Sequence, residues 1–228
     1  MKRTALLLAG WLVFLAGAPL FGQARKSLPE EEARRLLKQM SAKLAENRSL
    51  SARFEQERRL ALFDDTLRSR GVFFFRRPGR VRWEFVSPYA SIIVMDENGR
   101  VERFDVAEGR LRRVRTDGGR AMGEVLSRIS GWLYGDLEQS LRDFAFEMFA
   151  GPTHTLVLRP KSSALAALLS RIEFDIDPES FLVEAISLWE SESDVTVIRF
   201  GSQRLNDLLD DALFDLRTPR ILKPGEAR

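Results

Sequence analysis

Apolar residues recur at helical spacing between Pro29 and Asn47, which predicts one amphipathic helix there. Ser27 is a candidate N-cap, and the acidic residues 30–32 suit the positive end of a helix dipole. One face of this helix carries Ala33, Leu36, Leu37, Met40 and Leu44. Such a stripe must pack against another part of the chain.

From Leu50 onward apolar and polar residues alternate, which is typical of strands with one buried face. Turn signals such as Pro78-Gly79 separate these segments, so consecutive strands should pair antiparallel. The run Val72 to Phe75 is apolar throughout and indicates a strand shielded on both faces. We expect strands at Ser51 to Gln56, Ser69 to Arg76, Val81 to Val86, Ser91 to Met95, Val101 to Val106, Leu111 to Arg115, Phe144 to Phe149, His154 to Leu158, Arg171 to Ile176, Phe181 to Leu188, Val195 to Phe200 and Ala212 to Leu216.

Three further segments read as helical. Met122 to Tyr134 predicts a short amphipathic helix, which its internal glycines weaken by about 1 kcal/mol each. A weak helix with large apolar residues can move to open a cavity, but it can equally be a poorly stable connector packed on the sheet. Ser163 to Leu169 suggests a helical insertion, and Asn206 to Asp210 suggests one helical turn.

The chain of 228 residues allows a single domain once a targeting segment is removed. Residues 1–24 have the form of a secretory signal peptide, with Lys2 and Arg3 before an apolar run that is shorter than the ~20 residues a membrane span needs. We expect cleavage after Ala24, with Ala18 as the alternative site. The expected organisation is a signal peptide over 1–24, a folded domain over 25–220 and a disordered tail over 221–228.

Charge and composition exclude several classes of function. Two of the 36 basic residues lie in the signal peptide, which leaves 34 against 33 acidic residues and argues against nucleic-acid binding. The chain contains no cysteine and one histidine, so disulfides, thiolate metal sites and two-histidine zinc motifs are impossible. Neither a Gly-x-Ser-x-Gly motif nor a phosphate-binding loop occurs. We therefore expect no enzymatic activity, no cofactor and no metal.

A few polar groups remain as candidates for chemistry. His154 alternates within an apolar strand, which favours a structural role. Asp175 and Asp177 share one strand face and resemble a carboxylate pair, although a solvated face is the better interpretation. One segment is rich in arginines, which can bind anionic lipid headgroups or an acidic partner. The favoured interpretation is that they lie on the solvent-exposed face of a sheet. These are Arg100, Arg103, Arg110, Arg112, Arg113, Arg115 and Arg120.

One ordered set of motifs extends through the chain. Phe54-x-Gln56 is followed by the block Gly71-Val-Phe-Phe-Phe-Arg-Arg-Pro-Gly-Arg-Val-Arg-Trp-Glu84. After it come Pro88, Ile93-Val94, Asn98-Gly99 and Phe104, and more loosely Leu158, Pro160-Lys161, Phe174, Phe200, Asn206, Phe214 and Pro219. In this order, behind a signal peptide, they resemble the outer-membrane lipoprotein carrier protein family, LolA, over essentially the whole mature chain.

The resemblance implies a mainly β fold, in which an incomplete antiparallel β-barrel (a half-barrel) is closed by an α-helical lid around a hydrophobic cavity. It implies a monomeric periplasmic carrier that takes acylated lipoproteins from an inner-membrane ABC exporter to an outer-membrane receptor. Arg77, before Pro78, matches a family position at which an arginine binds the lid and acts as a latch. For the acyl-chain cavity we expect apolar residues of the early strands and the mid-chain helix to include several that line it: Phe54, Phe74, Trp83, Ile93, Leu126, Ile129 and Trp132.

Two other functions stay open. Periplasmic stress-signalling regulators use the same half-barrel, so a regulatory module that senses lipids or lipoproteins is the first alternative. Such regulators typically carry a second domain, for which this chain is too short. The other is a carrier of a different lipid-linked cargo, because Ser163 to Leu169 is more apolar than the family pattern requires.

Overall fold

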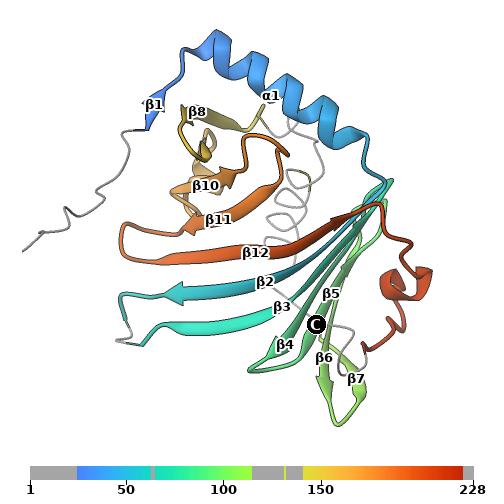
Figure 1. Cartoon of the computed structure of the whole chain (residues 1–228). Coiled ribbons are helices and arrows are strands. Elements are labelled where there is room, and N and C mark those ends of the chain that lie inside the picture. Colours follow the sequence, from blue (N-terminus) through green and yellow to red (C-terminus); the bar gives the residue numbers. More distant parts are fainter. Residues whose placement is uncertain (1–24, 63–64, 115–130, 132–140, 223–228) are drawn as a thin grey trace, which may run out of the picture.

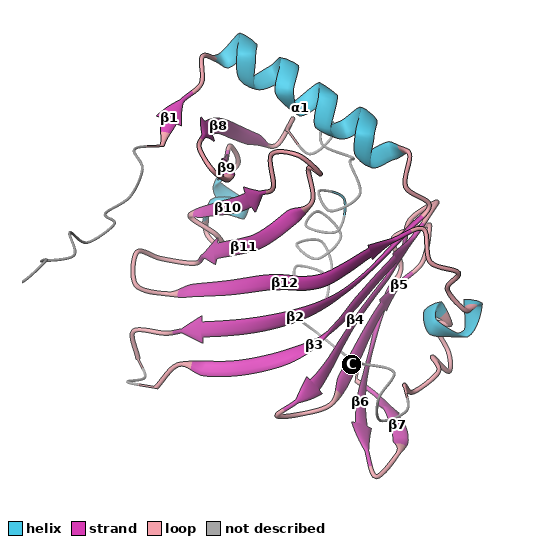
Figure 2. Cartoon of the chain, in the orientation of Figure 1, coloured by secondary structure: helices cyan, strands magenta, loops and turns pink. Residues whose placement is uncertain are grey.

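The computed structural model describes residues 25–62, 65–114, 131 and 141–222. Their dominant feature is one antiparallel sheet of twelve strands, with β1 and β7 at its two edges (Figures 1 and 2). The order across the sheet is β1 Lys26–Ser27, β8 Phe144–Ala150, β9 His154–Pro160, β10 Arg171–Ile176, β11 Val183–Trp189, β12 Val195–Leu205, β2 Ser49–Arg59, β3 Leu67–Arg76, β4 Arg80–Ser87, β5 Ser91–Met95, β6 Val101–Ala107 and β7 Arg110–Arg113. The prediction of a mainly β, antiparallel and open sheet is confirmed.

One long helix, α1 (Glu30–Ala45), packs on one side of this sheet, which we call the inner face (Figure 1). The predicted apolar stripe is the side that it buries, through Ala33, Leu37, Met40 and Leu44. The predicted cap is wrong: Ser27 belongs to β1, and the helix begins after Pro29 without a side-chain cap. The pairing of β1 with β8 accounts for this, because it holds Ser27 opposite Phe149.

The alternation of side chains along β3 separates two apolar clusters. Phe73 and Phe75 belong to the inner cluster with α1, whereas Val72 and Phe74 point to the outer face and join a second cluster. The outer cluster comprises Val72, Phe74, Ile92, Val94, Phe104, Leu213 and Phe214. The prediction that this run of four apolar residues is shielded on both sides is therefore confirmed.

The outer cluster is covered by the C-terminal segment, which departs from the sequence-based expectation. Ala212 to Leu216 is not a strand: residues Asp211–Phe214 form a 3-10 turn, capped by the Asp210 carboxylate, which accepts from the N–H of Ala212. The adjacent residues Leu213 and Phe214 both pack in the outer cluster, whereas neighbouring side chains of a strand would point to opposite faces. The expected helical turn at Asn206 to Asp210 is also absent from the structure, and Asn206 has a φ of 62°.

Most other boundaries agree with the prediction within a few residues. β5 and β10 match it at both ends, and the helical insertion is present as α4 (Ser163–Ala166). β11 begins at Val183 rather than Phe181, because Phe181 has a φ of 61°. Of the expected tail, Ile221 and Leu222 pack against the outer cluster. The rest of the tail, the signal peptide and the expected helix at Met122 to Tyr134 (apart from Gly131) lie outside the described residues.

Candidate ligand-binding face

An aromatic cluster occupies the inner face where β2, β3, β4 and β12 lie side by side. The ring centroids of Phe54 and Trp83 are 5.2 Å apart, and those of Phe54 and Phe85 are 5.1 Å apart, both edge to face. Phe73 lies 4.8 Å from Trp83, and Phe200 lies 5.8 Å from Trp83. These rings come from four strands that pair side by side, so the sheet register brings together residues from distant parts of the sequence.

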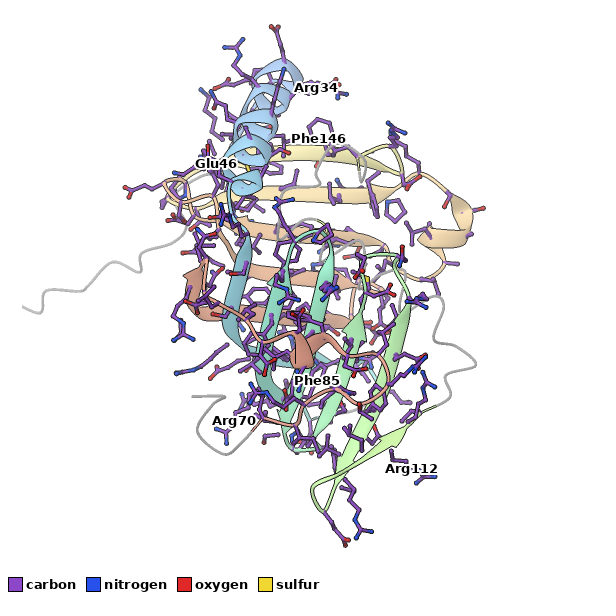
Figure 3. The ribbon with its side chains drawn as sticks, turned by 90° about the vertical axis from the view of Figure 1, so that its right-hand side faces the viewer. Arg34, Glu46, Arg70, Phe85, Arg112 and Phe146 are labelled. Carbon is purple, nitrogen blue, oxygen red and sulfur yellow. The ribbon has the colours of Figure 1, made fainter. Side chains whose placement is uncertain are left out.

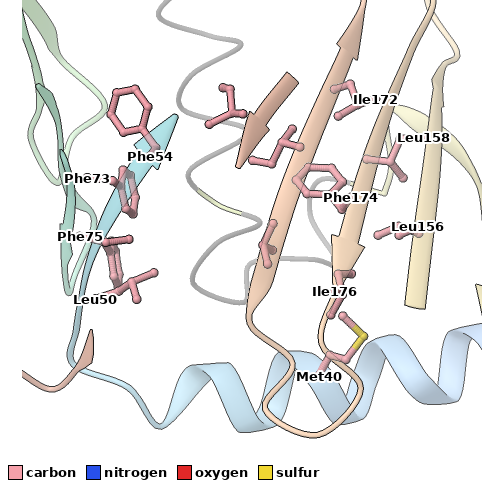
Figure 4. Packing of buried hydrophobic residues seen from close by; sticks show 14 of the residues in the cluster. Met40, Leu50, Phe54, Phe73, Phe75, Leu156, Leu158, Ile172, Phe174 and Ile176 are labelled. Carbon is pink, nitrogen blue, oxygen red and sulfur yellow. The ribbon is translucent and has the colours of Figure 1, made fainter. Parts of the chain in front are cut away.

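Aliphatic residues extend the same face across the other half of the sheet. Figure 4 shows Phe54, Phe73 and Phe75 on one side, the residues of β9 and β10 on the other, and Met40 of α1 beside them. The residues of β9 and β10 are Leu156, Leu158, Ile172, Phe174 and Ile176, all of which are buried. Among the described residues, the indole nitrogen of Trp83 has no hydrogen-bond partner. This face can therefore pack hydrocarbon over a large area but offers it few polar contacts.

Gly71 makes room for one member of the aromatic cluster. It is the residue of β3 directly opposite Phe54 on β2. A Cβ atom at position 71 would lie 2.6 Å from the Cζ atom of Phe54 and 2.0 Å from the carbonyl oxygen of Glu84. The glycine that opens the block Gly71 to Glu84 thus lets the Phe54 ring lie against the sheet.

The structure brings together some of the residues predicted for the cavity and separates others. Phe54 and Trp83 lie in the inner cluster, and the half-buried Ile93 packs against it. Phe74 must be corrected, because it points to the outer face and packs in the cluster beneath the C-terminal segment. Leu126, Ile129 and Trp132 lie outside the described residues. Phe73 also belongs to the inner cluster, and Phe85 and Phe200 pack against it; they were not predicted, although their alternation with Phe54 and Trp83 could have suggested them.

Arg77, directly after β3, holds the C-terminal end of α1. Its Nε donates to the carbonyl of Asn47 at 2.8 Å, and a second guanidinium nitrogen lies 3.3 Å from the carbonyl of Leu44. Its backbone N–H donates to the carbonyl of Arg48 at 2.9 Å. These carbonyls lie at the end of the helix and in the connection to β2, and that of Leu44 also accepts from the backbone N–H of Asn47 at 3.2 Å.

The same connection is also bound to the end of β12. The backbone N–H of Arg48 donates to Oδ1 of Asn206 at 2.8 Å, and the N–H of Asn206 donates to the carbonyl of Ser49 at 2.9 Å. The side-chain amide of Asn206 also reaches Oδ1 of Asn47 at 3.3 Å. The corner between α1 and β2 is thus anchored from two sides, by Arg77 and by Asn206.

Two arginines close to Arg77 in the sequence, Arg76 and Arg80, bind the C-terminal segment. Arg76 binds the carboxylate of Asp211 and the carbonyl of Leu209, and Arg80 donates to Asp211 at 2.8 Å and to Glu97 at 2.9 Å. The hydrogen bond from Arg76, its charge and the charge of Arg80 lower the pKa of Asp211. Both arginines hold the C-terminal segment on the outer face.

A buried ion pair lies beneath the same segment. The side chain of Arg82 is fully buried and donates to Glu84 at 2.5 Å, to the carbonyl of Leu213 at 2.8 Å and to the carbonyl of Arg220 at 2.8 Å. Burial lowers the pKa of Arg82, and the adjacent Glu84 carboxylate opposes that shift. Arg82 thus satisfies two backbone carbonyls of the C-terminal segment beneath the outer face, and Glu84 balances its charge.

The two aspartate candidates have structural partners, whereas the buried Nδ1 of His154 has no hydrogen-bond partner among the described residues. Asp175 accepts from Thr155 Oγ1 at 2.9 Å, and Asp177 accepts from the N–H of Ser180 at 2.7 Å within its turn. Hydrogen bonds from Ser180 lower the pKa of Asp177. Within the part of the chain that the structure describes, no group of three or more acidic, histidine or cysteine side chains could hold a metal ion.

The arginine-rich segment forms part of the β6–β7 hairpin, at the end of the molecule opposite α1, where Figure 3 labels Arg112. Arg100 pairs with Asp96 at 2.5 Å, and Arg113 pairs with Glu102 at 2.5 Å. Arg103 lies 3.5 Å from Asp105. Arg115 and Arg120 lie outside the described residues. These ion pairs agree with the favoured interpretation, in which the arginines lie on the solvent-exposed face of a sheet.

None of the helices in the described ranges is long and apolar enough to cross a bilayer. Comparison with solved structures gives several matches of low sequence identity. A LolA superfamily protein from Nitrosomonas europaea is 10% identical, with 80% of this chain and 97% of that chain covered and a TM-score of 0.42. A DUF1329 family protein from Desulfovibrio piger is 11% identical, with coverages of 84% and 99% and a TM-score of 0.46. A chain of the MucA/MucB complex from Pseudomonas aeruginosa is 13% identical, with coverages of 81% and 60% and a TM-score of 0.46.

No curated protein matches the sequence. The sequence profile of a family described as "Outer membrane lipoprotein carrier protein LolA", however, matches residues 45–217. This range begins at the last residue of α1 and includes the whole aromatic cluster, Arg77 and the 3-10 turn on the outer face. The chain therefore belongs to the LolA family of outer membrane lipoprotein carrier proteins.

Proposed function

We propose that the protein is a periplasmic carrier that holds the acyl chains of lipoproteins against its inner face and delivers them to the outer membrane. The observation that carries this proposal is the continuous apolar inner face, with its aromatic cluster and its buried aliphatic residues. Transfer of acyl chains through water costs about 0.8 kcal/mol for each exposed methylene. An apolar face that covers the acyl chains removes their contact with water and so makes the transfer possible.

We infer the route from membership of the family. Residues 1–24 would export the chain as a cleaved signal peptide, and an inner-membrane ABC exporter would supply the energy that removes the cargo from the membrane. An outer-membrane receptor would then take the lipoprotein over. The carrier itself would act as a monomer and would need no nucleotide, because it only has to shield the cargo and release it.

In this proposal Arg77 acts as the latch and α1 as part of the lid. A guanidinium offers five donors and no acceptor, so it suits the carbonyls of a helix end, which lack the full set of intrahelical donors. Its two side-chain hydrogen bonds to the end of α1 stabilise the closed and empty arrangement. Cargo that displaces α1 would have to break them, and their return would favour release.

Two measurements test the carrier function. The first is mass spectrometry of what copurifies with the protein from the periplasm. Triacylated lipoproteins are the expected ligands, a free glycolipid would redirect the proposal to another lipid-linked cargo, and a signalling protein would favour the regulatory alternative. The second uses bis-ANS, which should bind the folded protein and be displaced by an acylated peptide. A well-folded protein that binds no dye would exclude an accessible apolar site.

A further inference from the structure

Strand β12 has neighbours of unequal length on its two sides. Its pairing with β11 ends at Arg199 opposite Ala185, whereas its pairing with β2 continues to Leu205 opposite Leu50. Of the residues beyond this point, Phe200, Gly201, Arg204 and Leu205 therefore have a partner strand on one side only among the described strands, whereas Ser202, which has a φ of 52°, and Gln203 form an irregularity between the paired positions Gly201 and Arg204. In an antiparallel sheet alternate residues direct their N–H and C=O groups to each side. An edge of this kind can accept another extended chain.

A groove of about 880 Å³ lies along this edge and is open to solvent. Its lining includes Glu184 and Ala185 of β11 and residues 199–203 of β12. The side-chain amide of Gln203 donates to the carbonyl of Val183 at 2.9 Å and bridges the place where the two strands part. The lining also includes Thr155 of β9 and Asp175 of β10, so the groove extends from the place where β11 and β12 part across the neighbouring strands β10 and β9.

The groove opens on the outer face yet reaches a residue of the inner face. Asp175, Ala185 and Arg199 occupy consecutive paired positions on β10, β11 and β12, and all three line the groove. Their sequence neighbours Phe174, Ile186 and Ile198 belong to the inner cluster, so these three side chains point outward. Phe200 also lines the groove, and its ring lies 5.8 Å from that of Trp83.

The charges of the lining have both signs. Arg25 lies 4.0 Å from Asp175, and Arg199 lies 3.7 Å from Glu57 outside the groove. Glu184 adds a second carboxylate. An anionic headgroup would meet two carboxylates as well as two arginines, whereas a polypeptide main chain carries no net charge and finds donors and acceptors along the strand. Mixed charge thus favours a peptide as the occupant.

We propose that this groove receives an extended polypeptide segment, which pairs with the free side of β12. The segment is the stretch of a lipoprotein that follows its acylated residue, so the inference rests on the proposed carrier function. The acyl chains would lie on the inner face near Phe200, and the attached chain would pass to the outer face where β11 and β12 part. Main-chain pairing does not depend on the side chains of the cargo, so one groove serves lipoproteins of many sequences.

Site-directed cross-linking tests the proposal directly. The chain has no cysteine, so Ser202→Cys places a single thiol in the groove. Ser193→Cys, in the turn before β12, is the matched control, because Ser193 is also an exposed serine but lies outside the groove. The probe is a palmitoylated peptide with one activated cysteine a few residues after its acylated end. We expect it to form a disulfide with Ser202→Cys at least about tenfold faster than with Ser193→Cys, because binding raises the local concentration.

The outcomes separate this inference from the carrier function. If the probe displaces bis-ANS but reacts equally with both cysteines, the groove does not hold the peptide and the carrier function stands. If the probe does not displace the dye from the folded protein, both proposals fail. An unpalmitoylated peptide that reacts as fast as the probe would show that the groove binds peptides without any link to acyl chains, which also overturns the inference.

A second variant fills the groove. A Cβ atom at Gly201 would meet nothing within 4 Å, so Gly201→Trp can add a large side chain there without a backbone clash. We expect this variant to lower the affinity for the palmitoylated peptide by about tenfold while its affinity for palmitate alone stays unchanged. Ser193→Trp is the control for adding a surface tryptophan. Equal losses for the peptide and for palmitate would overturn the inference.

Discussion

The Nε atom of Arg77 lies 2.8 Å from the carbonyl oxygen of Asn47, two residues after the end of α1. Replacing Arg77 by Leu removes this bond and the one to Leu44, while the bonds of Asn206 to the same corner remain. The variant should fold, hold acylated cargo longer and transfer it to receptor-containing membranes about tenfold more slowly, which corresponds to about 1.4 kcal/mol.

Arg77→Lys supplies the matched control for the latch. A lysine keeps the charge but lacks the planar fork that reaches two carbonyls, so its transfer rate should lie between those of the other two proteins. Transfer by the Leu variant at the parental rate would show that Arg77 only supports the corner between α1 and β2.

Two phenylalanines on opposite faces separate binding from stability. Phe200→Ala removes a ring of the inner aromatic cluster and should weaken the binding of bis-ANS and of palmitate. Phe74→Ala leaves the inner face intact but opens a hole in the outer cluster, so it should lower the free energy of unfolding by about 3 kcal/mol with little change in ligand affinity. Urea unfolding and dye titration measure the two effects. Loss of binding in Phe74→Ala, measured where that variant is folded, would contradict the assignment of the faces.

The buried pair of Arg82 and Glu84 predicts a non-additive response. Glu84→Ala leaves a fully buried guanidinium without its carboxylate and should lower the free energy of unfolding by about 3–5 kcal/mol. The double variant Arg82→Met, Glu84→Leu should lose less, because no uncompensated charge remains. Denaturant unfolding of both proteins gives the comparison, and a double variant at least as unstable as Glu84→Ala would refute the prediction.

Acid should loosen the C-terminal segment. The pKa of Asp211 is lowered in the folded protein by Arg76 and Arg80. The stabilisation is therefore complete above the ordinary carboxyl pKa of about 4 and is lost as the pH falls through the lowered value. The unfolding midpoint of the parent should exceed that of Asp211→Asn at pH 7, and the difference should close in acid. The comparison between proteins is needed because Asp96, Glu97, Asp177 and Asp215 also have lowered pKa values. A constant difference across this pH range would show that Asp211 contributes nothing through its charge.

The sequence predicts the strands well because alternation and tight turns are local signals. Ser91 to Met95 and Arg171 to Ile176 are strands with the predicted limits, and the run Val72 to Phe75 is buried on both faces. Alternation also shows which residues share a face. It does not show which face meets α1, and for that reason Phe74 was placed with Phe54 although the two point to opposite sides.

The C-terminal segment could not be predicted from local pattern. Arg82 and Leu213, whose carbonyl it binds, are separated by 131 positions in the sequence. A strand residue such as Arg82 alternates with apolar neighbours and therefore looks solvent-exposed. Only the covering segment makes it a buried residue, and the apolar pair Leu213 and Phe214 gave no indication of the face to which it would bind.

Burial on both faces of β3–β5 has a consequence for how such a protein can work. A single-sided sheet that exposes its one apolar face to take up a ligand gives up much of what keeps it folded. Here the sheet is stabilised on its outer face by the outer cluster and by the C-terminal segment that Arg76, Arg80 and Arg82 bind. The inner face is thus free to exchange one hydrophobic contact for another, while the scaffold that presents it remains intact.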